Sequence, residues 1–157
     1  MEIEQTEKLL NAVHENLTMA TQSLDMITKE VEDKEFLTYL TNQNEQYSNY
    51  LKECEMIAKS YNIELKKHTF EKAQLWISLK MSTILDKSVR KYAELIYLGT
   101  SMGIPDLICA INDFENASDE ALELAKNLKL SEEDYEMEIK QFIGKGKKEE
   151  YNPKTQE

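Results

Sequence analysis

A chain of 157 residues is long enough to bury one core, and its formal net charge of −11 argues against nucleic acid and anionic membrane surfaces as partners, because both attract clustered Lys and Arg. Only four Gly and two Pro are present, too few turn-forming residues for a β-rich domain, so the composition predicts an all-α fold. The sequence carries no basic leader and no apolar run of about 20 residues, and Cys54 and Cys109 have no metal-type spacing. We therefore expect a cytoplasmic protein with two free thiols, outside any membrane.

The first part of the chain predicts two long helices of matched length. Apolar residues recur at alternating spacings of three and four along residues 2–30, and again along residues 34–62. The segment from Val31 to Lys34 is polar and short, which favours a tight connection. We expect these helices to form an antiparallel pair.

A longer connection follows, over residues 63–87. Within it Phe70, Ile77 and Ile84 fall on one face of a short amphipathic helix predicted over residues 70–85. A connection of this length can run along the whole bundle. We therefore expect the long helices on either side of it to be parallel.

The second part of the chain predicts another pair of long helices, over residues 88–115 and 118–143. Ser88 and Ser118 stand at the starts of these two helices, before their regularly spaced apolar residues, and are good N-cap residues. The segment 144–157 is polar and rich in Gly and Lys, so we expect a disordered tail.

The order of these elements, two long helix pairs joined by a long crossover with a short helix, resembles the ferritin-like superfamily. The segment AELIYLGTSMGI, residues 93–104, is also similar to one in a group of small bacterial helical-bundle proteins without an assigned activity. The likeness extends over residues 5–143. It implies that residues 1–143 form an all-α, ferritin-like four-helix bundle.

The diiron site of ferritin-like proteins needs a Glu on each of two helices and a Glu-x-x-His on each of the other two. Neither His14 nor His68 follows a Glu by three positions, and the segments 45–48 and 132–135 end in Ser and Tyr where the pattern needs His. No nucleophile–base pair and no Gly-rich phosphate loop is evident. The sequence therefore predicts no metal and no cofactor, and favours a protein that is not an enzyme.

One acidic residue falls on an apolar stripe: Glu132 occupies a core position of the last helix. The polar residues expected at its level or one turn away complete a candidate buried polar layer of Glu132, Tyr47, Gln43, Thr100 and Asn16. A buried carboxyl needs partners or keeps its proton. A hydrogen-bonded layer that fixes helix register is the favoured interpretation. A rim position for Glu132, and a pocket for a small ligand or metal, stay open.

Two glycines lie beside this layer. Gly99 and Gly103 are four residues apart on one helix face. They either let another helix approach closely or leave room for a ligand, and close packing is the commoner use of such a pair.

A candidate self-association surface lies on the short helix. Leu75, Trp76 and Leu79 fall to the side of its covered face and form an apolar patch. A two-fold homodimer would cover this patch, unless residues 62–69 fold over it. The sequence thus favours a non-catalytic, acidic bundle that acts by self-association or by binding a protein partner. The alternative is a degenerate ferritin-like metal or redox protein that uses carboxylates and Tyr.

Overall fold

A computed structural model describes residues 2–68, 70–84 and 88–150, and this part of the chain contains five helices and no strand. The helices are α1 (Glu2–Thr28), α2 (Lys34–Ser60), α3 (Glu71–Ser82), α4 (Val89–Asp113) and α5 (Asp119–Glu150). The predicted all-α class is confirmed, and four of the five helices begin and end close to the expected positions.

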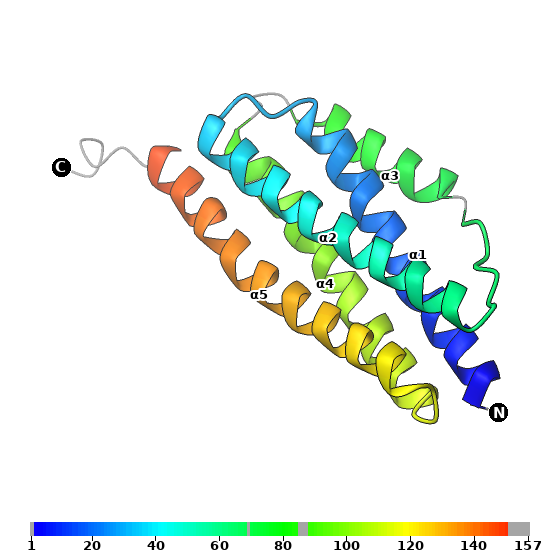
Figure 1. The fold of residues 1–157 in the computed structure, drawn as a ribbon. Helices are drawn as coiled ribbons and strands as arrows, with labels where there is room; N and C mark the ends of the chain where they lie inside the picture. The colour runs from blue at the N-terminus through cyan, green and yellow to red at the C-terminus, as the bar shows by residue number, and fades with distance from the viewer. Residues whose placement is uncertain (1, 69, 85–87, 151–157) are drawn as a thin grey trace.

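The four long helices form the bundle, and α3 lies along its outside (Figure 1). Helix α1 packs against α2 and α4, and α5 packs against the same two helices. Figure 1 shows α2 and α4 running in the same direction, and α3, which follows α2 in the sequence, running the opposite way beside α1.

Side-chain caps fix where three of the helices begin. Ser88 Oγ accepts a hydrogen bond from the Lys91 amide, and Ser118 Oγ accepts one from the Ala121 amide, as predicted. Asp33 caps α2 in the same way, accepting from the Phe36 amide at 2.9 Å. These caps satisfy amide groups that have no partner inside their own helix.

The C-terminal helix is longer than expected. Helix α5 continues to Glu150, so the expectation of disorder from residue 144 onward is wrong for residues 144–150. Residues 151–157 lie outside the described residues. Lys and Glu are strong helix formers, and each Gly costs only about 1 kcal/mol once a helix is already propagating.

Helix α4 is the most apolar element. Among the described residues it alone is long and apolar enough to cross a bilayer by length and composition. In the structure 22% of its apolar stretch is buried. Charged residues such as Glu94 and Asp106 interrupt α4, so it contains no continuous apolar run of about 20 residues. In the structure α4 packs against α1 and α5, and its outer face exposes Leu98 and Met102.

Candidate functional site

The candidate polar layer comes together in the middle of the bundle. Glu132, Gln43 and Tyr47 are almost completely buried, and Asn16 and Thr100 are half-buried. All five side chains line one cavity, and they come from the four long helices. The rim position considered for Glu132 is therefore wrong, since only 3% of this residue is exposed.

The cavity has a volume of about 250 Å³ and lies between α1 and α4. Helix α3 covers it with Trp76 and Ile77, while α2 and α5 contribute the buried polar groups. An apolar cavity of about 150 Å³ is enough to bind benzene in another protein. This cavity therefore has room for a ligand of roughly 10 non-hydrogen atoms.

Its walls are mainly apolar, and the two glycines of α4 shape it. The apolar side chains are Ala12, Met19, Ala20, Leu24, Ile27, Leu95, Ile96 and Leu107. A methyl group added at Gly99 would meet nothing within 4 Å, so this glycine leaves open space. One added at Gly103 would lie 3.1 Å from Asn16 Nδ2. Gly103 thus permits the close approach of the Asn16 side chain from α1.

The hydrogen bonds of the polar layer run mostly within single helices. Gln43 Nε2 donates to Tyr47 Oη at 3.2 Å, and Thr100 Oγ1 donates to the Ile96 carbonyl at 3.0 Å. Among the described residues of the layer, Asn16 reaches other helices: its Nδ2 donates to the Gly103 carbonyl at 3.4 Å, and its side chain also hydrogen-bonds to the Glu132 carboxyl. The five residues meet, but they do not form the closed network that the sequence favoured.

Three oxygen atoms of the layer are buried without a hydrogen-bond partner among the described residues. They are Glu132 Oε2, Asn16 Oδ1 and Gln43 Oε1. A buried acceptor without a partner costs about 1–3 kcal/mol. These three acceptors are the strongest sign that the cavity is built for something other than helix packing.

Burial controls the ionisation of the two titratable groups inside the layer. Removal from water raises the pKa of Glu132 to about 8, and the nearby Asn16 amide offsets part of this rise. Burial also raises the pKa of Tyr47 well above its ordinary value, with a smaller contribution from Glu132. At neutral pH the cavity therefore holds a mostly protonated carboxyl beside a neutral phenol.

The charged groups that line the cavity are all acidic. Glu15 and Asp106 are exposed and stand at its mouth, and Glu132 lies inside. The described lining contains no Lys, Arg or His. Any charged group that enters will meet a negative potential.

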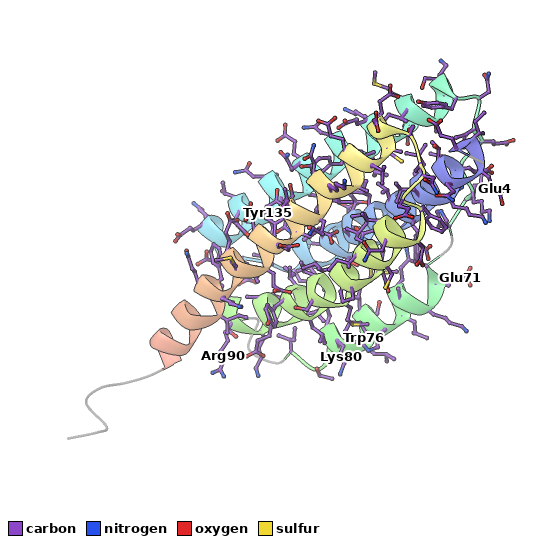
Figure 2. All side chains as sticks on the ribbon, turned by 90° about the horizontal axis from the view of Figure 1, so that it is seen from below. Glu4, Glu71, Trp76, Lys80, Arg90 and Tyr135 are labelled. Carbon is purple, nitrogen blue, oxygen red and sulfur yellow. The ribbon has the colours of Figure 1, made fainter. Side chains whose placement is uncertain are left out.

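The predicted self-association residues are exposed, and one of them also belongs to the cavity. Leu75 and Leu79 are each 59% exposed, whereas Trp76 is 36% exposed and lies at the cavity mouth. Figure 2 labels Trp76 on α3 beside Lys80, whose Nζ lies 5.6 Å from the centre of the indole ring. The sequence pattern predicted that Trp76 belongs to the apolar patch but not that it lines the cavity, because the cavity depends on how α3 packs relative to α1 and α4.

The two histidines meet away from the cavity. The rings of His14 and His68 are 5.4 Å apart, and burial followed by the charge of His68 lowers the pKa of His14. Within the described part of the chain, no group of three or more His, Cys, Asp or Glu side chains is placed to hold a metal ion. The sequence offered no signal for this contact, because the two residues are far apart along the chain.

Comparisons with known proteins inform the fold. Neither a protein-family model nor a curated protein sequence matches the chain. The fold is similar to that of YcfI from Rhodopseudomonas palustris, a protein described provisionally as structural. The two align with a TM-score of 0.63 over 84% of this chain and 90% of YcfI, at 13% sequence identity. At this identity the likeness establishes an all-α bundle fold that is shared, and no activity.

Proposed function

We propose that this protein is a non-catalytic binding protein whose bundle holds a small, mainly apolar molecule with one polar group. The observation that carries the proposal is the cavity of about 250 Å³ into which Glu132 presents an unpaired oxygen. Pockets for small molecules are mostly apolar, with a few polar groups that fix the orientation of the ligand. The cavity between α1 and α4 matches that description.

The hydroxyl groups of the cavity favour binding over catalysis. Ser23 Oγ donates to the Met19 carbonyl and Thr100 Oγ1 donates to the Ile96 carbonyl, so neither hydroxyl is aligned with a base. Activation of a nucleophile would require such a base within hydrogen-bonding distance. Glu132 therefore acts here as a recognition group.

The test is binding of 2-phenylethanol, a neutral compound with an aromatic body and one hydroxyl. We expect it to raise the melting temperature of the wild-type protein and to change the fluorescence of Trp76, the only tryptophan in the chain. Gly99→Leu should abolish both effects, because Gly99 lines the cavity and a leucine there would compete with the ligand for its space.

The matched control is Gly144→Leu. It places the same side chain on α5, where an added Cβ also meets nothing within 4 Å, but away from the cavity. Equal binding by the wild type and Gly99→Leu, or none by either up to the solubility of the compound, would contradict the proposal.

Self-association through α3 is the second candidate function. It is supported by the exposure of Leu75 and Leu79, and by the packing of α3 mainly on α1. The parallel course of α2 and α4 also supports the ferritin-like relationship, which we propose for the fold. Sedimentation should give a wild-type dimer that Leu75→Ser with Leu79→Ser converts to a monomer. A wild-type monomer at high concentration would exclude this candidate.

A further inference from the structure

We propose that the cavity takes a primary amine with a compact apolar body, and that its ammonium group is held by Glu132, Asn16 and Gln43. This inference rests on the proposed binding function and names the class of ligand. It goes beyond that function because the cavity alone would admit a neutral or an acidic compound of the same size.

The polar groups of the cavity require hydrogen-bond donors. The unpaired atoms Glu132 Oε2, Asn16 Oδ1 and Gln43 Oε1 can all accept a hydrogen bond, and they come from three different helices. The hydroxyls of Ser23 and Thr100, which also line the cavity, already donate to carbonyl groups of their own helices. A primary ammonium has three N–H donors and no acceptor, so its donors match the three unpaired acceptors in number. A carboxylate or phosphate has no N–H donor and would leave these three acceptors unpaired.

The charge of the site points to the same ligand class. Glu15 and Asp106 flank the mouth, the described lining has no basic side chain, and the whole chain carries a formal net charge of −11. Such a field attracts cations and repels anions. The Trp76 ring in the lining already has an ammonium group 5.6 Å from its centre, that of Lys80.

The rest of the cavity fits the apolar body of such an amine. Leu24, Leu95 and Leu107 line the space next to the polar end, and Gly99 leaves it open. The volume of about 250 Å³ admits an aromatic ring with a short chain. A quaternary ammonium of the same size lacks N–H donors and would leave all three acceptors unpaired.

Binding should depend on pH through the ionisation of Glu132. Of the other titratable groups in the lining, Tyr47 from α2 interacts with Glu132, whereas Glu15 from α1 and Asp106 from α4 are exposed, and α3 contributes only Trp76 and Ile77. With a pKa of about 8, Glu132 is roughly one-tenth ionised at pH 7 and mostly ionised at pH 9. The apparent affinity for an ammonium ion should rise roughly tenfold over this interval. It should fall again above about pH 10, where the amine loses its charge.

The experiment titrates the full chain with 2-phenylethylamine and 2-phenylethanol, which differ only in the polar group, at pH 7 and pH 9 by calorimetry. At pH 9 we expect the amine to bind at least tenfold more tightly than the alcohol. Glu132→Gln should reduce this preference to less than about threefold. Glu123→Gln, which removes an exposed carboxyl from the same helix, should keep the preference.

The outcomes separate this inference from the proposed function. If both compounds bind wild-type protein with equal affinity at pH 9, the ammonium site is refuted and the apolar binding function stands. If neither compound binds, both are refuted. The wild-type pH profile is a second, independent measurement: an affinity for the amine that does not change between pH 7 and pH 9 would also overturn the role of Glu132.

Discussion

Two helix–helix interfaces of the bundle, here called seams, are filled by different kinds of side chain and differ in how tightly they are packed. Between α2 and α5 aromatic rings pack against one another, with the Phe36 and Phe142 centroids 4.9 Å apart and those of Tyr47 and Tyr135 5.4 Å apart (Figure 2 labels Tyr135). Between α1 and α4 the facing residues include Ala12, Ala20, Gly99 and Gly103, and the cavity lies there. Large side chains close one seam and small ones leave the other open.

Tyr47 belongs to both seams, and this explains why the polar layer lies where it does. Its ring packs against Tyr135 while its hydroxyl accepts a hydrogen bond from Gln43 at the cavity. A buried tyrosine can combine an apolar body with a polar tip in this way. The closed seam thus fixes the orientation of a group that faces the open one.

The largest expected effect compares the same substitution outside and inside the open seam. Leu40 is completely buried on α2 and does not line the cavity, whereas Leu24 on α1 is nearly buried and does. Leu40→Ala should lower the free energy of unfolding by about 4 kcal/mol, because it adds a closed cavity to the lost transfer energy. Leu24→Ala should lower it by about 2 kcal/mol, since it enlarges an existing space. Urea unfolding measures both, and equal losses would show that the seams are packed alike.

The next effect concerns pH. Glu132 has a pKa of about 8 in the folded protein and 4.5 without the fold, so the folded state binds this proton more tightly. The contribution of Glu132 to the free energy of unfolding is therefore full below about pH 4.5 and is lost as the pH rises toward 8. Between pH 5 and pH 8 the wild type should lose about 3 kcal/mol more than Glu132→Gln. Parallel curves for the two proteins in urea unfolding would show that Glu132 ionises as freely as an exposed carboxyl.

The sequence predicted most of the fold because its signals are local. The apolar stripes set the helices, Ser88 and Ser118 mark two of the starts, and the level of Glu132 along α5 placed it with Tyr47. The open space was not predictable, because it depends on how close α1, α3 and α4 come to one another. The place of Trp76 in the cavity lining was not predictable for the same reason.

The smallest expected effect separates the two glycines of the open seam. Gly99→Ala should stabilise the protein by about 1 kcal/mol, because alanine favours a helix over glycine and its methyl group meets nothing within 4 Å. Gly103→Ala gains the same helix propensity, but its Cβ would lie 3.1 Å from Asn16 Nδ2. Asn16 would have to move, which weakens its 3.4 Å hydrogen bond to the Gly103 carbonyl and shifts it against Glu132.

We therefore expect Gly103→Ala to be about 1 kcal/mol less stable than Gly99→Ala in urea unfolding, a difference of the size of one hydrogen bond. Gly144→Ala provides the reference, because an added methyl group on α5 also meets nothing within 4 Å and lies outside the cavity. If Gly103→Ala is as stable as Gly99→Ala, Asn16 moves freely. In that case Asn16 is not held in place to receive a ligand, and the polar end of the cavity is less ordered than its contacts indicate.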